Sequence, residues 1–228
     1  MNPYSLIINV LRGKHEESMR EKLKNSDFSI ISQNCWGGVV YHMLGMPMLS
    51  PTVNMFITGE NFVKLAKDPK RYLNIDPHPI MDEYMNETDK PHPVIGIDDI
   101  RLNCLHYKNC MDAIIDWNRR KQRVNFDKLL VMATSWDLND DLNLINEILK
   151  LSTPHIVFSY DEIDDECVVK LDHKIWARDE CGKISPTLTG YYKHGIYRNF
   201  EKIFDVVNWI NTSLETSEKA GLIDDRCG

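Results

Sequence analysis

One cysteine stands where an apolar strand-like run meets a helix-like run, within Phe28–Gly38. The N-terminus of a helix presents free N–H groups and the positive end of the helix dipole, which suit a phosphate, a carboxylate or a thiolate. Cys35 in this place is therefore a candidate nucleophile with a lowered thiol pKa. The candidate substrate contacts of the same segment are Asn34, Trp36, Gly37 and Gly38. The alternative is structural: the glycine pair serves helix–sheet packing, Cys35 is a small buried residue, and the segment fits no known phosphate or nucleophile-elbow fingerprint.

Two further residues with acid–base chemistry follow expected strands. His106 is a candidate general acid or base, although a lone histidine is more often a hydrogen-bonded structural residue. Asp137 closes an apolar strand, and it is a candidate for assisting proton transfer, for ligating a divalent metal or for holding a ribose hydroxyl. The favoured alternative is a helix N-cap at Asp137 or Asn139, because acidic residues follow in the expected first turn.

The segment Arg119–Arg123 is the one basic cluster in an acidic protein. It falls at the C-terminal end of an expected helix, where cations compensate the helix dipole. The sharper interpretation is that Arg119 or Arg120 binds a phosphate or carboxylate in a bidentate manner. This pattern is consistent with a small anionic substrate.

The cysteines indicate free thiols. The chain has six, with wide and irregular spacing and no CxxC pair, which is atypical of a disulfide framework. Cys104, His106 and Cys110 supply three potential zinc ligands within seven residues, but a zinc site needs a fourth ligand. Two half-buried cysteines at the end of a strand are the favoured interpretation, and the sequence gives no support for a metal.

Hydrophobic periodicity predicts an α/β fold: a three-layer structure with a mostly parallel sheet flanked by helices. The expected strands are 28–32, 93–97, 100–105, 128–134, 155–159 and 168–171. The expected helices are 3–24, 39–44, one that begins at 59 or 61 and continues to 66, 110–124, 137–150 and 200–213. We expect a surface loop at 74–92 and a glycine-punctuated stretch at 172–196. We interpret 1–228 as a single domain with a frayed tail from about 217.

Composition excludes several classes of protein. The 228 residues are 43% hydrophobic and 27% charged, with a formal charge of −7, which argues against nucleic-acid binding and against polybasic membrane attachment. No apolar stretch approaches the roughly 18 residues of a transmembrane segment, and the N-terminus lacks the features of a signal peptide. We therefore expect a cytoplasmic protein.

Several segments resemble a bacterial family of uncharacterised proteins that carries the label exopolysaccharide biosynthesis protein. The resemblance covers roughly residues 20–212. Its most specific segments are Asn34–Gly38, Ser50–Ile57, Leu105–Lys108, Trp117–Arg120 and Phe204–Asn211. Asn54 and Tyr107, which lie in two of these segments, complete the candidate substrate contacts. The chain departs from its relatives at Ser135-Trp136-Asp137, where an Asp-Arg-Asp-like turn is common, and at Asn103, where a histidine is common; both departures weaken a metal or paired-histidine site.

The resemblance and the residue pattern together predict a transferase of surface-polysaccharide assembly. It would move a glycosyl, phospho or acyl group from an anionic activated donor such as a nucleotide sugar, in association with polysaccharide-assembly enzymes. One alternative is a hydrolase or acyltransferase that depends on Cys35, with His106 as its base. A third is a non-enzymatic glycan-binding factor in which Trp36, Trp117 and Trp136 stack on sugars.

Overall fold

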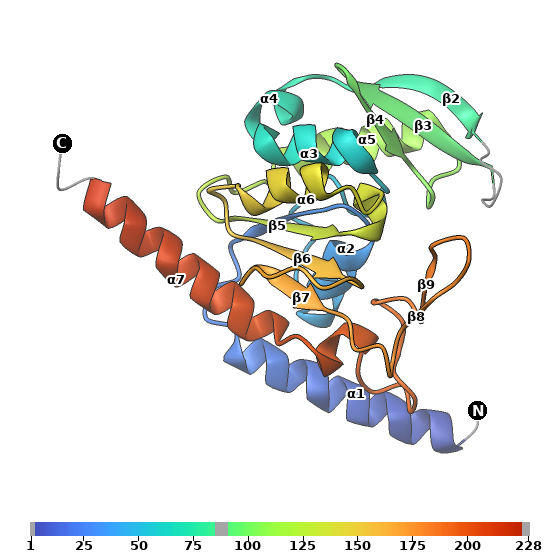
Figure 1. Ribbon diagram of the computed structural model, residues 1–228, viewed down its shortest axis with the longest axis vertical. Helices are drawn as coiled ribbons and strands as arrows, with labels where there is room; N and C mark the ends of the chain where they lie inside the picture. Colours follow the sequence, from blue (N-terminus) through green and yellow to red (C-terminus); the bar gives the residue numbers. More distant parts are fainter. Residues whose placement is uncertain (1–2, 85–90, 225–228) are drawn as a thin grey trace.

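The computed structural model describes residues 3–84 and 91–224 and is built around a parallel sheet (Figure 1). This sheet has four strands in the order β1-β5-β6-β7. They are β1 (Ser29–Ser32), β5 (Leu129–Thr134), β6 (His155–Ser159) and β7 (Val168–Lys170). Every residue of β1, β5 and β6 is buried, as expected for apolar strands that are covered on both faces.

Helices cover both faces of the sheet, because successive strand residues point to opposite sides. Ile31 and Val131 share one hydrophobic cluster with α3 (Gly59–Lys67), α5 (Cys110–Lys121) and α6 (Leu142–Leu149). Ile30 and Met132 share a second cluster with α1 (Pro3–Lys22), α2 (Trp36–Met43) and α7 (Val206–Asp224). The expected three-layer α/β architecture with a mostly parallel sheet is confirmed.

A smaller antiparallel sheet lies beyond α3 and α5 (Figure 1). Its strands are β2 (His78–Tyr84), β3 (His92–Ile97) and β4 (Ile100–Asn103), and the short α4 (Pro69–Asn74) precedes them. A third sheet is the two-stranded hairpin of β8 (Ala177–Arg178) and β9 (Ile184–Ser185).

Strand β2 corrects the expectation of a loop over 74–92. All seven of its residues are exposed and it pairs only with β3, so it has none of the buried alternation by which a strand is recognised. Its prolines, Pro79 within the strand and Pro77 just before it, also mimic a loop signal, although proline is tolerated at a sheet edge. Residues 85–90 of the expected loop lie outside the described part of the chain.

Two expected helices are also corrected. The helix expected at 137–150 is a 3₁₀ turn, η1 (Trp136–Leu138), followed by α6, because Asn139 and Asp140 adopt positive φ angles of 61° and 51°. The N-cap is Asp141, whose carboxylate accepts a 2.8 Å hydrogen bond from the Asn143 N–H. The expected helix 200–213 divides into η2 (Asn199–Lys202) and α7, and α7 continues to Asp224. The tail beyond Asp224 lies outside the described residues.

The helices of the described residues include none that is both long and apolar enough to cross a membrane. Five cysteines, Cys35, Cys104, Cys110, Cys167 and Cys181, are free thiols, as expected.

Candidate functional site

Cys35 and His106 lie side by side, although 71 residues separate them. Cys35 occupies the N-cap position of α2, directly after β1. His106 lies in the turn that follows β4, which a hydrogen bond from the Tyr107 N–H to the Cys104 carbonyl closes at 3.0 Å. The Cys35 Sγ atom is 3.1 Å from the His106 Nε2 atom, within hydrogen-bonding distance for sulfur. The two residues that sequence reasoning proposed as nucleophile and base are therefore in contact.

A short segment between the two sheets explains this contact. The Ile57 N–H donates to the Gln33 carbonyl at 2.9 Å, which attaches the segment to the chain just before Cys35. Phe56 and Asn103 exchange backbone hydrogen bonds of 2.8 and 2.9 Å, which attach the same segment to the end of β4. The carboxyl ends of β1 and β4 are thus held together, and each carries one member of the pair.

Asp137 lies beside this pair and is held by the neighbouring strand ends. Its Oδ2 atom accepts hydrogen bonds from Asn34 Nδ2 at 2.9 Å and from Thr134 Oγ1 at 2.7 Å. Asn34 Oδ1 in turn accepts from the Trp36 N–H at 3.1 Å. Since β1 and β5 are adjacent parallel strands, their carboxyl ends meet at one edge of the sheet. The carboxylate therefore orients the residue that precedes the cysteine, and it does not cap a helix as the favoured alternative predicted.

Burial is the largest cause of the raised pKa values of Asp137 and Cys35. It raises the pKa of the Asp137 carboxyl, and the hydrogen bonds from Asn34 and Thr134 only partly oppose that shift. Burial, followed by the nearby charge of Asp137, raises the pKa of the Cys35 thiol. The expectation of a lowered thiol pKa is therefore wrong. The raised pKa disfavours the thiolate, so a reaction at Cys35 needs a base.

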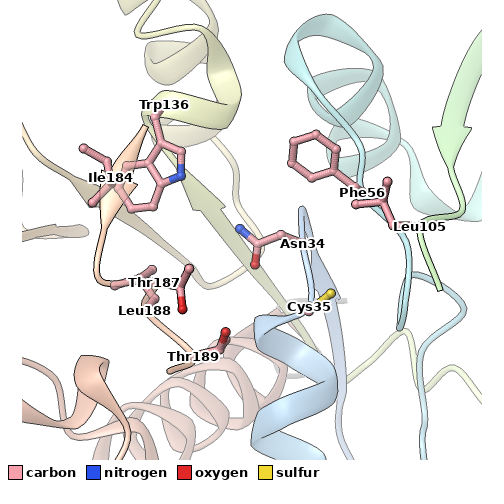
Figure 2. Close-up of a pocket in the computed structure, with 9 residues that line it drawn as sticks. All are labelled: Asn34, Cys35, Phe56, Leu105, Trp136, Ile184, Thr187, Leu188 and Thr189. Carbon is pink, nitrogen blue, oxygen red and sulfur yellow. The ribbon is translucent and has the colours of Figure 1, made fainter. Parts of the chain in front are cut away.

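A cavity of about 210 Å³ opens next to Cys35 (Figure 2). None of its lining residues carries a charge; they are Asn34, Cys35, Phe56, Leu105, Trp136, Ile184, Thr187, Leu188 and Thr189. Figure 2 shows the Trp136 indole and the Asn34 amide projecting from opposite sides toward the cavity. Such a cavity suits an uncharged group with apolar surface and few hydrogen-bonding positions.

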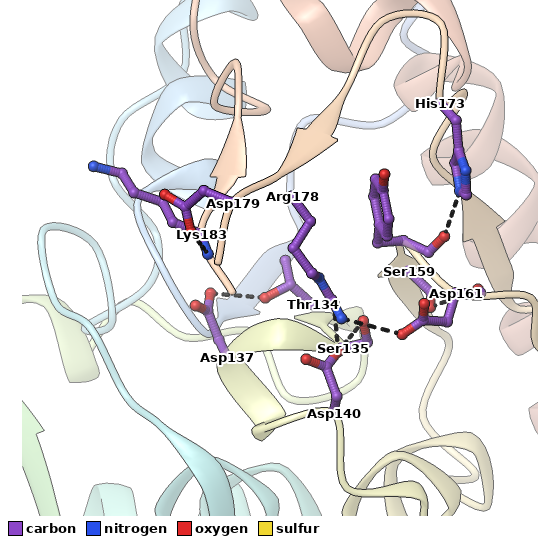
Figure 3. Close-up of polar contacts among 11 residues, drawn as sticks. Thr134, Ser135, Asp137, Asp140, Ser159, Asp161, His173, Arg178, Asp179 and Lys183 are labelled. Carbon is purple, nitrogen blue, oxygen red and sulfur yellow. Dashed lines mark hydrogen bonds and ion pairs between the residues drawn. The ribbon is translucent and has the colours of Figure 1, made fainter. Parts of the chain in front are cut away.

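The cavity wall opposite Cys35 comes from the β8–β9 hairpin and the residues that follow it, which sequence reasoning did not identify. Arg178 attaches this hairpin to the main sheet (Figure 3). Its guanidinium donates to Asp140 Oδ1 at 2.9 Å and to Asp161 Oδ2 at 3.3 Å, and it lies 5.1 Å from the Tyr160 ring centroid. No local sequence signal marks this link, because the partners of Arg178 are 38 and 17 residues away.

The glycine pair serves packing, which is the structural alternative. A Cβ atom on Gly37 would lie 2.9 Å from the Ser32 Cβ, and one on Gly38 would lie 3.0 Å from a Val53 methyl carbon. The Gly37 N–H already donates to Ser32 Oγ at 3.1 Å. Together with the bond between Trp36 and Asn34, this contact occupies N–H groups that a phosphate would need. These two N–H groups are therefore not free to bind a phosphate.

The basic cluster does not contribute to the cavity lining. Arg120 is buried and donates to the Val53 carbonyl at 3.0 Å, to the Tyr107 hydroxyl at 2.8 Å and to Asp116 Oδ2 at 2.8 Å. Arg119 is exposed and pairs with Asp116 at 2.5 Å. Neither arginine lines the cavity, and both have a carboxylate partner. The network of Arg120 and Tyr107 instead braces the turn that carries His106.

The remaining candidate residues, Trp36, Trp117 and Asn54, do not line the cavity. Trp36 and Trp117 are fully buried, so the predicted three-tryptophan platform is not formed and only Trp136 lines the cavity. Asn54 adopts a positive φ of 67° in the loop before Phe56 and is not part of the cavity lining. Within the residues that the structure describes, no three His, Cys, Asp or Glu side chains form a metal-binding group.

The fold and the site define an α/β protein with a cysteine–histidine contact whose cysteine lines an uncharged cavity. The chain belongs to the family described as a domain of unknown function, DUF1919, whose model matches residues 7–211. It is similar to an uncharacterized protein of Haemophilus influenzae, with 28% identity over 171 residues that cover 69% of this chain and 80% of the relative. The matched range of the family contains every residue of the site.

Proposed function

We propose that the protein is a thiol-dependent acyltransferase or hydrolase in which Cys35 is the nucleophile and His106 is the general base. The observation that carries this proposal is the 3.1 Å contact between Cys35 Sγ and His106 Nε2, together with the uncharged cavity that Cys35 lines. A nucleophile within hydrogen-bond reach of a base is the recognisable geometry of covalent catalysis.

The first half-reaction begins with transfer of the Cys35 thiol proton to His106. A His106 imidazole with its proton on Nδ1 presents the Nε2 lone pair to the thiol proton. As Nε2 takes this proton, the Cys35 sulfur attacks the carbonyl carbon of an ester or thioester. The protonated His106 then gives the proton to the departing alcohol or thiol, and the acyl group stays on Cys35 as a thioester.

The second half-reaction releases the acyl group. An acceptor hydroxyl loses its proton to His106 Nε2 and attacks the thioester carbon. The thiolate that leaves takes the proton back from the imidazole, which restores Cys35. Water as the acceptor makes the protein a hydrolase, and a sugar hydroxyl makes it an acyltransferase. The expected role in surface-polysaccharide assembly favours the sugar hydroxyl and remains a prediction.

Asp137 assists as a positioning residue, and Asn34 assists as a hydrogen-bond donor to the reacting group. An amide nitrogen carries two donor hydrogens, and Asn34 Nδ2 uses one of them on Asp137. The other hydrogen is available to the oxygen of the tetrahedral intermediate, because Asn34 also lines the cavity. Phe56, Leu105, Trp136, Ile184 and Leu188 line the cavity and supply the apolar surface that would hold the acyl group.

The contacts support glycosyl or phospho transfer from an anionic donor less well. Arg119 and Arg120, which were expected to neutralise such a donor, lie elsewhere and are paired with Asp116. None of the cavity-lining residues is basic.

The test is turnover of p-nitrophenyl esters with short and medium acyl chains, followed by the release of p-nitrophenolate. We expect the wild type to release it and Cys35→Ser to lose the activity. Cys167→Ser is the matched control, since Cys167 is also a partly buried free thiol but lies outside the cavity lining, and it should retain full activity. Equal turnover by Cys35→Ser and wild type would rule the proposal out.

A further inference from the structure

A group of cations and tyrosines gathers where the segment after the hairpin meets α1. The members, which we call the tyrosine–cation cluster, are Arg12, Tyr191, Tyr192, Lys193, Tyr197, Arg198 and Lys202. Figure 1 shows this segment beside α1, at the end of the molecule that carries the hairpin. The cluster is separate from the residues that line the cavity at Cys35.

Two guanidinium groups share one ring in this cluster. The Cζ atoms of Arg12 and Arg198 lie 3.9 and 3.8 Å from the centroid of Tyr191. Arg12 also donates to the Gly195 carbonyl at 2.9 and 2.6 Å, and Arg198 donates to the Thr189 carbonyl at 2.9 Å. These contacts hold the two guanidinium groups against opposite faces of the Tyr191 ring, and each group keeps N–H donors for an oxyanion at the edge of the ring.

The cluster also lacks carboxylate partners. Among the described residues, Arg12, Lys193, Arg198 and Lys202 form no ion pair with an acidic side chain. Glu201 is the acid beside Lys202, but its Oε1 contacts His15 Nε2 at 2.5 Å and its Oε2 accepts from the Arg198 backbone N–H at 2.5 Å. Unpaired cations are notable in a chain of net charge −7.

A hollow of about 300 Å³ lies against the same tyrosines. Its lining adds Lys174 and Pro186 to Tyr191, Tyr192 and Lys193. Aromatic rings offer flat apolar faces to a polyol ring, while the ammonium and guanidinium groups offer donors to an oxyanion.

We infer that the tyrosine–cation cluster binds a phosphate monoester of a small polyol, with the phosphate against Arg12, Arg198 and Lys202 and the polyol in the hollow. This site stands independently of the proposed chemistry at Cys35. The cluster carries one link to the cavity, since Arg198 holds the carbonyl of Thr189, a cavity-lining residue.

Isothermal titration of the full chain with glucose 1-phosphate, inorganic phosphate and glucose tests this inference. We expect glucose 1-phosphate to bind most tightly, inorganic phosphate more weakly and glucose not at all. Raising the ionic strength should weaken binding of both anions. Equal affinity for the two anions would overturn the role of the hollow, and failure of both to bind would overturn the site.

Variants separate binding by the cluster from general attraction to positive charge. Lys202→Gln should weaken binding of glucose 1-phosphate about tenfold, because a hydrogen bond to a charged group is lost. Lys202 and Lys193 have no side-chain hydrogen bond among the described residues, so their glutamine variants should fold. Arg123→Gln removes one equally exposed charge outside the cluster and is the control. Equal weakening by Lys202→Gln and Arg123→Gln would contradict the assignment.

Discussion

The two cysteines nearest to His106 in the sequence are buried, whereas Cys35, which contacts its imidazole, is partly exposed. Cys104 lies two residues before His106, yet it is fully buried and burial raises the pKa of its thiol to about 12. Cys110 lies four residues after His106, is also buried, and donates its thiol to the carbonyls of Met81 and Val94 at 3.1 and 3.3 Å. Cys35 is distant in sequence but is partly exposed and touches the imidazole. Proximity in sequence therefore says little about thiol reactivity, which depends on access and on a base.

Removal of the base His106 should have the largest effect on the reactivity of Cys35. The pKa of the Cys35 thiol is raised, and His106→Gln removes the group that would accept its proton. We therefore expect acylation of Cys35 by p-nitrophenyl esters to slow by about 10²–10⁴-fold. Stopped-flow absorbance measures this rate. His42→Gln is the control, because His42 is an exposed histidine of the helix that follows Cys35. An unchanged rate in His106→Gln would remove His106 from the chemistry.

Removal of Arg120, which braces the turn that carries His106, should have the next largest effect, and this effect is on stability. Arg120→Met leaves Asp116 and Tyr107 without their buried partner, and we expect a loss of about 3 kcal/mol in the free energy of unfolding. The adjacent Arg119→Met should cost less than about 0.5 kcal/mol, because its ion pair is exposed. Urea denaturation measures both values. Similar losses in the two variants would show that Arg120 does not brace the turn.

The glycine pair offers a smaller test of how Cys35 is positioned. Gly37→Ala puts a methyl group 2.9 Å from the Ser32 Cβ, and we expect it to destabilise the protein by about 1–3 kcal/mol. Gly13→Ala is the matched control in α1, where no atom lies within 4 Å of the new methyl group. Alanine there should stabilise by up to about 1 kcal/mol, since it is the better helix former. A stabilising Gly37→Ala would contradict the packing role.

Asp137 should have the smallest effect on the thiol. Its charge is the second cause of the raised Cys35 pKa, so Asp137→Asn should shift the pH profile of iodoacetamide alkylation toward lower pH. We expect alkylation at pH 7.5 to be about two- to tenfold faster, and the thiol pKa to stay above its ordinary value because burial persists. The unchanged profile of Cys167 within the same sample is the control. A shift toward higher pH would contradict the assigned influence of Asp137.

The same carboxyl predicts a pH dependence of stability. Its pKa is raised in the folded state, so the folded protein binds this proton more tightly than the unfolded chain does. The stabilising contribution is complete below the unfolded pKa and is lost as the pH rises through the folded pKa. Asp137→Asn should therefore lose less stability than the wild type between acidic and neutral pH.

Hydrophobic patterns in the sequence predicted the parallel sheet correctly, because apolar runs such as Leu129–Thr134 leave few alternatives to a buried strand. They failed for His78–Tyr84, where exposure and proline removed the signal. Local propensity also placed the helix start at Asp137 or Asn139, whereas the left-handed conformation of Asn139 and Asp140 delays it to Asp141.

The candidate site was predictable only in part. Residue type singled out Cys35, His106 and Asp137, but their distances depend on which strands are neighbours and on the segment Phe56–Ile57 that joins two sheets. Arg119 and Arg120 carry the same charge in the sequence, and only the packing distinguishes a buried brace from an exposed ion pair. The cavity wall at Ile184–Thr189 has no chemical signature of its own.

The most direct test of the nucleophile is to trap the covalent intermediate. The protein is mixed with a p-nitrophenyl acyl ester, quenched in acid and measured as intact protein and as peptides by mass spectrometry. The predicted result is one acyl group, attached to Cys35, whose formation His106→Gln slows and which Cys104→Ser leaves unchanged. An adduct on any other residue, or none on Cys35 while the ester is turned over, would contradict the assignment of Cys35 as the nucleophile.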